Sequence, residues 1–430
     1  MQRTEKLPSL SSAASWTLTL IPIVALALFV WHFSTNAPYG DDYDAILNAT
    51  LALDNSHSVP EFFHNLTAQH NEHRIVPVRL LSYLYAKLFG TLNFKIMIAL
   101  GFLQIVALLL LLGKIRGDKL DVRTLWPVSL LLFQPSYHET ILWAETTWSN
   151  TTVILFAFFS LYMLLGKRQV VAGAVLALVA TYSQANGILT FVAGAAGLLA
   201  QQRYRELPAW LVASAVAGFC FFYGYHHPPN HPPFDLSLPG FWHDVQFFVL
   251  QLGSIGKIRT TCAVFGVIML CAILFLAPFL WRKQALLGSL ILFLLMTAAS
   301  AALARSQMGV KFAVLSRYTI ISVALLILLY LAASARWSQR TALATFGVIA
   351  IIVNLYQWSR SGDQSKYAHM LAAQAKVGDS CYQNIVYPAP GTINAVRTLA
   401  VAESQGIYFL HRQAHADTDA TVICLGQMTP

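Results

Sequence analysis

Three carboxylates stand close together in the stretch NAPYGDDYDAI, residues 36–46. Asp41, Asp42 and Asp44 follow directly on an apolar segment over residues 16–33. Acidic side chains near hydrocarbon are costly and are usually retained for function. A carboxylate can remove a proton from a hydroxyl group, and a pair of carboxylates can hold Mg²⁺ or Mn²⁺. We expect Asp41 or Asp42 to be a general base, whereas helix capping explains Asp44 equally well.

A second polar group stands in the sequence HNEHR, residues 70–74. From Arg74 onward, apolar residues recur at helical spacing, which predicts an amphipathic helix on the membrane surface. Glu72, His73 and Arg74 come at its N-terminal end, where backbone N–H groups favour anions. We expect these three to bind substrate, and a local Glu–Arg pair is the structural alternative. The histidines of this region lack the spacing of a recognised zinc site: His64, His70 and His73.

The composition is that of a multi-pass membrane protein. Of the 430 residues, 57% are hydrophobic and 11% charged, whereas soluble domains carry about a quarter charged residues. We expect an all-α polytopic membrane protein with about eleven transmembrane helices. The predicted spans cover residues 15–33, 92–112, 125–136, 150–166, 169–182, 187–200, 208–225, 260–280, 284–304, 318–334 and 341–358. Two of them, 125–136 and 169–182, are short for a hydrocarbon core about 30 Å thick.

Basic residues in alternate breaks between these spans set the orientation. Lys and Arg collect in the short cytoplasmic loops of membrane proteins, so the net charge of +9 gives no reason to expect nucleic acid. The breaks that carry them are Arg3/Lys6, Lys114/Arg116/Lys119/Arg123, Lys167/Arg168, Arg203/Arg205, Arg282/Lys283 and Arg336/Arg340. The N-terminus is therefore expected in the cytoplasm and the C-terminus on the outer, periplasmic side. That side receives a first outer loop (34–91), two further loops (134–150 and 226–259) and a tail (359–430).

This layout divides the chain into a membrane domain over residues 1–358 and a small soluble C-terminal domain over residues 359–430. Cys381 and Cys424 lie in the tail. An oxidising outer compartment favours a disulfide between them, and two free thiols are the alternative.

The order of these features resembles the GT-C superfamily of integral-membrane glycosyltransferases. Members carry a first span, an Asp-rich motif opening a long outer loop, an interfacial helix, many further spans and a small outer C-terminal domain. The resemblance covers the layout of nearly the whole chain, with Asp41–Asp42 as its local motif. HNEHR is not a motif common to the superfamily.

The resemblance implies an inverting transferase of the bacterial inner membrane that takes its sugar from a polyprenyl-phosphate donor. The acceptor would be a glycan, a lipid or a protein on the outer face. One of Asp41 and Asp42 would be the base, and the other would orient it or help to bind a divalent cation. Tyr43, beside the pair, would contact substrate.

A phosphate leaving group needs cations near the outer surface. The candidates are Arg74, Arg79, Arg305, Lys311 and Arg317. Arginine suits bidentate phosphate binding. The loop ARSQMGVKFAVLSRY carries the last three and no acid, although it lies on the outer side. The alternative is that Arg305 and Arg317 extend from span ends toward the lipid headgroups.

Acceptor contacts are predicted in the second outer loop. Glu139 and Glu145 stand there among Tyr and Trp residues, so acids could bond sugar hydroxyls while rings stack on sugar faces. Interfacial Trp and Tyr also serve as ordinary membrane anchors. Gln184 and Asn186 of YSQANG could bind hydroxyls, but a turn explains Asn-Gly as well.

Three other classes of protein are alternatives. A flippase or transporter places polar groups in broken helices at mid-membrane, often in inverted repeats, and no repeat is detected here. A lipid-linked glycan polymerase or ligase also uses outer arginines, but an Asp pair after the first span is not expected of it. An outer-face acyltransferase would favour a catalytic histidine.

Overall fold

The computed structural model describes residues 11–117, 121–228, 232–235, 237–360, 362 and 391–409, and this part of the chain is all-helical. Six long helices are α1 (Ser12–Phe33), α5 (Phe94–Arg116), α14 (Arg259–Lys283), α15 (Ala285–Arg305), α16 (Ser316–Arg336) and α17 (Gln339–Ser359). A seventh runs unbroken through α8 (Ala144–Thr146), η3 (Thr147–Thr151), α9 (Thr152–Leu161) and η4 (Tyr162–Gly166).

These seven helices are long and apolar enough to cross a membrane, which indicates a multi-pass membrane protein. The remaining predicted spans coincide with shorter helices, namely α6 (Val122–Leu132), α10 (Val170–Thr181), α11 (Leu189–Ala200) and α12 (Leu207–Phe222). At 1.5 Å per residue, twelve residues reach only about 18 Å, so a short helix alone does not span the hydrocarbon core. The count of about eleven therefore stays a prediction.

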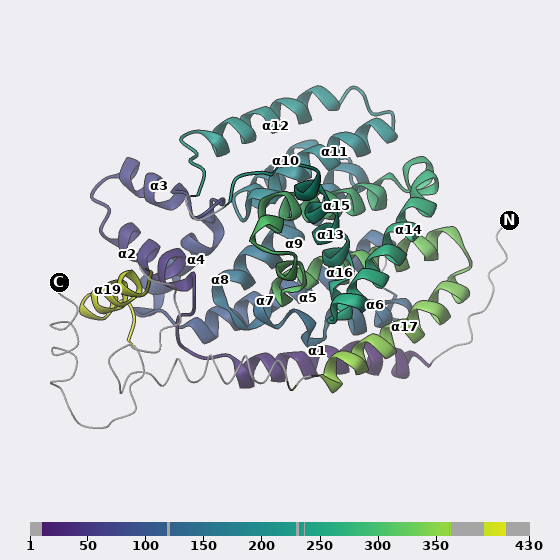
Figure 1. Cartoon of the computed structure of the whole chain (residues 1–430), viewed down its shortest axis with the longest axis horizontal. Helices are drawn as coiled ribbons and strands as arrows, with labels where there is room; N and C mark the ends of the chain where they lie inside the picture. Colours follow the sequence, from purple (N-terminus) through teal and green to yellow (C-terminus); the bar gives the residue numbers. More distant parts are fainter. Residues whose placement is uncertain are drawn as a thin grey trace.

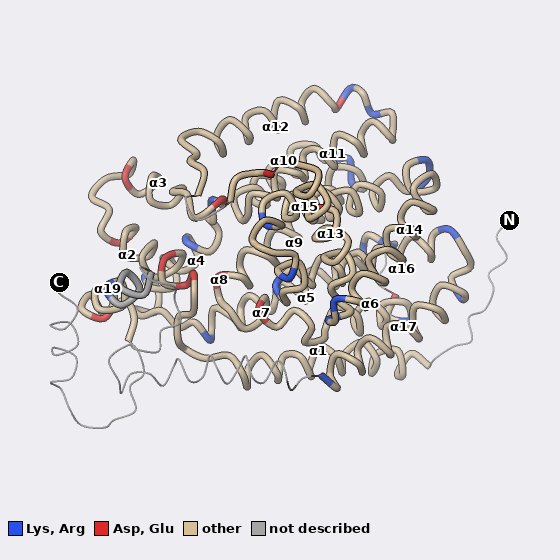
Figure 2. The backbone as a smooth tube through the Cα atoms, viewed as in Figure 1, with Lys and Arg blue, Asp and Glu red and all other residues tan. Residues whose placement is uncertain are grey.

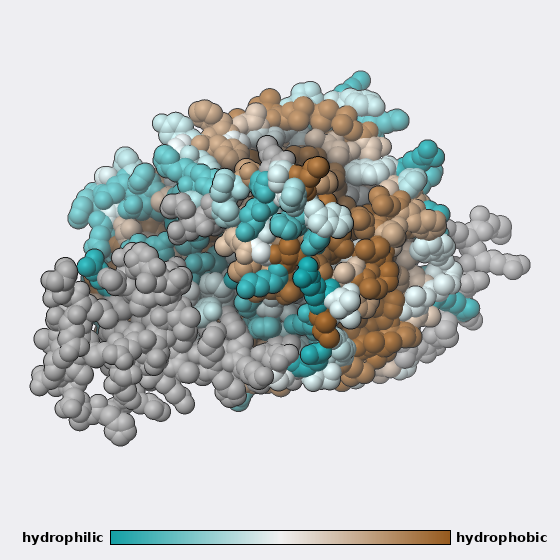
Figure 3. Space-filling view, in the orientation of Figure 1, coloured by the Kyte–Doolittle hydropathy of each residue, from teal (hydrophilic) through white to brown (hydrophobic). Residues whose placement is uncertain are grey.

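Charge divides the two ends of the helix bundle. Figure 2 shows Asp and Glu concentrated around α2 (Ala49–Asp54), α3 (Val59–Thr67) and α4 (Val76–Phe89), whereas many Lys and Arg lie at the far end. Figure 1 places the first outer loop and the C-terminal helix together at the acid-rich end. Between the ends, Figure 3 shows brown hydrophobic surface over α12 and α14, with a smaller area of hydrophilic residues between them.

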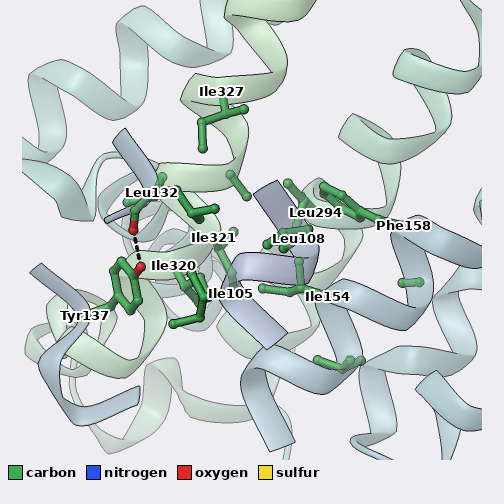
Figure 4. Close-up of a cluster of buried hydrophobic side chains, with 14 of the residues drawn as sticks. Ile105, Leu108, Leu132, Tyr137, Ile154, Phe158, Leu294, Ile320, Ile321 and Ile327 are labelled. Atoms are coloured by element: carbon green, nitrogen blue, oxygen red, sulfur yellow. Dashed lines mark hydrogen bonds between the residues drawn. The ribbon is translucent and has the colours of Figure 1, made fainter. Parts of the chain in front are cut away.

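Helix α16 lies at the centre of the bundle, with 78% of its span buried. Figure 4 shows its isoleucines against side chains from α5, α6, α9 and α15. The labelled members are Ile105, Leu108, Leu132, Tyr137, Ile154, Phe158, Leu294, Ile320, Ile321 and Ile327. Because the hydrocarbon of the membrane does not drive helices together, such close packing is the main source of their association. The first turn of α16 carries Arg317, so this packing fixes the position of that side chain.

The first outer loop folds into η1 (Tyr43–Asn48), α2, α3 and α4. Helix α4 occupies the segment predicted to be amphipathic and begins at Val76. Its exposed face carries Leu80, Leu84 and Leu88 at four-residue spacing, while Arg79 on another face is buried. The helix is therefore amphipathic, and its contact with a membrane surface stays a prediction.

The C-terminal segment packs against this loop through α19 (Gly391–Ser404) and the residues that follow it. Tyr408 is fully buried and donates a hydrogen bond from its hydroxyl to the carbonyl oxygen of Asn36, at 2.8 Å. The backbone N–H of Leu92 donates to the carbonyl of Ile407. Residues 391–409 and the first outer loop thus lie on the same side of the molecule. The predicted pair Cys381–Cys424 falls outside the described residues.

Candidate functional site

A cavity of about 560 Å³ opens beside the first outer loop and brings together side chains from seven separate parts of the chain. Six of the predicted site residues line it: Asp41, Glu72, His73, Glu145, Arg305 and Arg317. Its size and its apolar walls with a few polar groups are typical of small-molecule sites.

The structure separates the roles of the two adjacent aspartates. Asp41 lines the cavity, whereas Asp42 is buried at 1% exposure and points into the protein. The Asp42 oxygens accept the backbone N–H groups of Tyr39 at 3.0 Å and Glu145 at 2.8 Å. Burial raises the pKa of Asp42 well above its ordinary value, although these two hydrogen bonds oppose the change. Asp42 therefore fixes the turn that presents Asp41.

A glycine permits this turn to approach the neighbouring helix closely. Gly40 has φ +52°, and a Cβ there would stand 2.7 Å from the ring of Trp143. Tyr39 packs edge-on against the same ring, with centroids 4.9 Å apart. Left-handed backbone is strained for residues with a side chain. The sequence YGDD thus folds over Trp143 and directs Asp41 into the cavity.

Glu145 stands at the start of the long helix that continues through α9. Its backbone N–H is held by Asp42, and its side chain, 6% exposed, hydrogen-bonds to Ser149. Glu145 lines the cavity together with Asp41. The structure therefore offers two carboxylates to one ligand, although they are distant in sequence.

His70 forms a carboxylate–histidine pair with Asp44 at the edge of this acid group. Its Nδ1 lies 3.0 Å from an Asp44 oxygen, and the buried ring lines the cavity. Burial alone would lower the pKa of His70, but the bond to Asp44 and the charges of Asp41 and Glu145 raise it. The bond to His70 lowers the pKa of Asp44 to about 2. These neighbours thus favour the positively charged form of His70, which stands among three acids.

Residues 70–73 form a tight turn over the cavity. The backbone groups of His70 and His73 exchange two hydrogen bonds of 2.8 Å, and Asn71 between them has φ +47°. His73 Nδ1 accepts the N–H of Ala185 at 3.1 Å, so its proton lies on Nε2, 3.4 Å from Glu72. The turn is therefore anchored on the loop that follows α10.

Arg305 and Arg317 supply positive charge to the same cavity. Arg305 donates to the Glu72 carboxylate and to the Tyr318 hydroxyl. The guanidinium of Arg317 stands 5.5 Å from the centre of the Tyr318 ring, and among the described residues no carboxylate forms an ion pair with it. Burial alone would raise the pKa of Glu72, but His73 and Arg305 lower it to about 2. The Glu72–Arg305 pair is thus charged at neutral pH.

Two of the predicted phosphate ligands, Arg74 and Arg79, lie away from the cavity. Arg74 donates to the carbonyls of Thr67, Phe221 and Tyr223, and thereby joins the first outer loop to the end of α12. Arg79 donates to carbonyls of residues 65–68. Both guanidinium groups are buried in these contacts, which makes them structural in this conformation.

Glu139 caps a helix rather than facing the cavity. Its carboxylate accepts from the Ser316 hydroxyl at 2.9 Å and from the N–H of Arg317 at 3.0 Å. An anion at the N-terminus of α16 is favoured by the helix dipole. Tyr43, the first residue of η1, is buried at 9% exposure, and Lys311 lies in η8 (Val310–Val314); neither lines the cavity.

Three amide side chains in the cavity could bind hydroxyl groups, and the sequence predicted two of them. Gln184 and Asn186 line the cavity, as does Asn150, which accepts from Gln184 at 2.7 Å. Asn186 donates to Thr297 at 3.2 Å. An apolar rim completes the cavity with Phe222, Phe234, Met308 and Phe312, the first three exposed at 55%, 63% and 42%.

The two aspartates differ in their surroundings at the predicted cation site. Asp41 faces the cavity, whereas each Asp42 oxygen accepts a backbone N–H. A carboxylate oxygen that accepts one hydrogen bond keeps a second lone pair. A divalent cation held by Asp41 and Asp42 therefore stays a prediction.

Comparison with known proteins adds no relative to this picture. No family model, curated protein or solved structure matches the chain.

Proposed function

We propose that this protein is a membrane glycosyltransferase that uses a polyprenyl-phosphate sugar and acts on the outer face of the bacterial inner membrane. The acceptor is a hydroxyl group of a cell-envelope glycan, lipid or protein. The basic end of the bundle would face the cytoplasm, in keeping with the positive-inside rule.

The observation that carries the proposal is the shared cavity of Asp41, Arg305 and Arg317. An acid that can accept a proton stands in one enclosed space with two cations that can bind a phosphate. The exposed rim of Phe222, Phe234 and Met308 gives a hydrocarbon chain an apolar surface at the entrance. A lipid-linked phosphate sugar has all three chemistries in one molecule.

In the proposed step the acceptor oxygen attacks the anomeric carbon from the face opposite the phosphate. The new C–O bond forms as the bond from the anomeric carbon to the phosphate oxygen breaks, so the configuration inverts. Asp41 takes the hydroxyl proton, and the phosphate leaves with the bonding electron pair. Arg305 and Arg317 stabilise the charge that develops on it. Asp42 positions the turn that carries Asp41, and His70 in its charged form offsets the charge of Asp41.

The test is transfer by the purified full-length protein from radiolabelled polyprenyl-phosphate sugars to membrane-derived acceptors. Asp41→Asn should lower the rate by about 10² to 10⁴-fold, the usual contribution of a general base. Arg317→Gln should raise the KM for the donor. Full activity of Asp41→Asn would overturn the assignment of the base, and absence of transfer from every donor would overturn the reaction class.

A second candidate is acyl transfer with His70 as the base. It is favoured by the 3.0 Å contact between Asp44 and His70, because a carboxylate that orients an imidazole is a common catalytic arrangement. If the protein transfers acyl groups, His70→Gln should abolish activity and Asp41→Asn should reduce it only partly. If it transfers glycosyl groups, Asp41→Asn should have the larger effect and His70→Gln the smaller.

A further inference from the structure

The inner wall of the cavity contains an amide that no other described residue satisfies. Gln251, near the end of α13 (Leu238–Leu252), is 0% exposed and forms part of the cavity wall. Neither its Nε2 nor its Oε1 has a hydrogen-bond partner within the described chain. An unpaired buried amide costs free energy at both of its atoms.

Comparison with the other buried glutamines of the described chain sets Gln251 apart. Gln134 is bonded at both ends of its amide, Gln104 accepts from Thr152, and Gln357 donates to the carbonyl of Ile255. None of these three lines the cavity. The only one of these four described glutamines with both amide atoms unpaired is also the one that lines the cavity.

Hydroxyl-bearing residues of α15 extend the same wall. Thr297 and Ser300 line the cavity on α15, as does Arg305, which lies about 12 Å beyond Thr297 along the helix at 1.5 Å per residue. A sugar attached to a phosphate at Arg305 could therefore extend along this wall toward Ser300, Thr297 and Gln251. In a site that binds only a hydrocarbon chain, an unpaired amide at this position would be unfavourable.

We propose that Gln251, with Thr297 and Ser300, forms an inner subsite that binds the ring hydroxyls of the transferred sugar and selects among donor sugars. A carboxamide offers a donor and an acceptor side by side, which matches two neighbouring hydroxyls. Enclosure strengthens such bonds, and a sugar without the matching hydroxyl leaves the amide unpaired. This inference rests on the proposed glycosyl transfer.

The test compares two probes on the purified full-length protein. One is a short polyprenyl phosphate, and the other is the same lipid carrying a hexose. The hexose is glucose, galactose or mannose, whichever gives the lipid that the wild type binds most tightly. Gln251→Leu keeps a similar volume and removes the amide. It should weaken binding of the hexose lipid about tenfold or more and leave the bare lipid unchanged. Gln357→Leu is the matched control and should change neither affinity.

Thermal unfolding gives a second readout that does not depend on the reaction. Gln251→Leu removes an unpaired buried amide and should leave Tm unchanged or higher, whereas Gln357→Leu leaves the Ile255 carbonyl unpaired and should lower it. A fall in Tm for Gln251→Leu as large as that of the control would overturn the subsite. So would equal losses of affinity for both lipids, or no loss for either. Failure of the wild type to bind either lipid would instead overturn the proposed function, and with it the donor-sugar subsite.

Discussion

Glu72 and Arg305 form an ion pair across the cavity, although 233 positions separate them in the sequence. Their side chains are 17% and 22% exposed, so the pair is largely withdrawn from water. A phosphate that binds Arg305 must compete with this carboxylate. The ion pair therefore both holds the loop over the cavity and limits access to the arginine.

Glu72→Gln should loosen the loop and release Arg305. We expect unfolding free energy to fall by about 1–3 kcal/mol, because a partly buried charge loses its partner. Affinity for a polyprenyl phosphate should rise several-fold, measured by titration of the purified protein. Asp54→Asn is the control, since Asp54 pairs with the half-exposed Lys87 and should cost less than about 1 kcal/mol. Weaker phosphate binding by Glu72→Gln would contradict this account.

Asp41→Asn and Asp42→Asn should distinguish a role in the reaction from a role in holding the turn. The first should lower the transfer rate by about 10² to 10⁴-fold with unchanged Tm. The second replaces an acceptor of two backbone N–H groups and should cost about 1–3 kcal/mol of stability, with a smaller loss of rate. Rate and Tm measured on both variants decide this. A stable Asp42→Asn protein that is as inactive as Asp41→Asn would reverse the two roles.

The Asp44–His70 pair should make stability depend on pH. The His70 pKa is raised on folding, so its stabilisation is complete below pH 6.5 and is lost as pH rises through the folded value. The Asp44 pKa is lowered to about 2, so its share is complete above about pH 4 and is lost toward pH 2.

Tm measured at pH 5.5 and pH 8.5 should therefore fall more for the wild type than for His70→Gln. Asp41, Asp44 and Glu145 are the acids whose charges act on His70, and all three remain in the variant. The same fall in both proteins would show that this pair carries no pH dependence.

Gly40→Ala should damage the site through the backbone. The new methyl group meets the Trp143 ring at 2.7 Å and the residue has φ +52°, so we expect a cost of about 2–4 kcal/mol and a lower transfer rate. Gly90→Ala is the control, because Gly90 has φ +80° but no atom within 4 Å of a Cβ. It should cost about 1 kcal/mol and leave the rate unchanged. Equal effects of both substitutions on the rate would exclude a special role for the Gly40 turn.

The sequence predicted best those features that depend on one continuous segment. The apolar runs and their basic ends predicted the helices and grouped the acids with the first outer loop. Local sequence could not rank Asp41 above Asp42, because the difference depends on Glu145 and Trp143, which belong to another helix. Arg74 and Arg305 were equally good phosphate ligands until packing directed Arg74 onto the carbonyls of Phe221 and Tyr223.

The roles of other site residues could not be predicted, because they depend on contacts between residues that are distant in the sequence. His70 was considered only as a metal ligand, and its partner Asp44 lies 26 positions earlier. Glu139 and Glu145 occur in one loop, but only Glu145 turns into the cavity, since the start of α16 needs Glu139 as a cap. Gln251 had no signal in the sequence, because its significance lies in the hydrogen bonds that it does not make within the described chain.

The contact between Tyr408 and Asn36 has a consequence for the order of assembly. It joins positions 372 residues apart, and Asn36 begins the stretch that carries Asp41. The acid-bearing loop is therefore synthesised long before the residue that supports it. Contacts of such long sequence separation form late, after the chain entropy between them has been overcome. A chain interrupted before Tyr408 would lack this brace, so the final position of the loop that carries Asp41 depends on residues that are added much later.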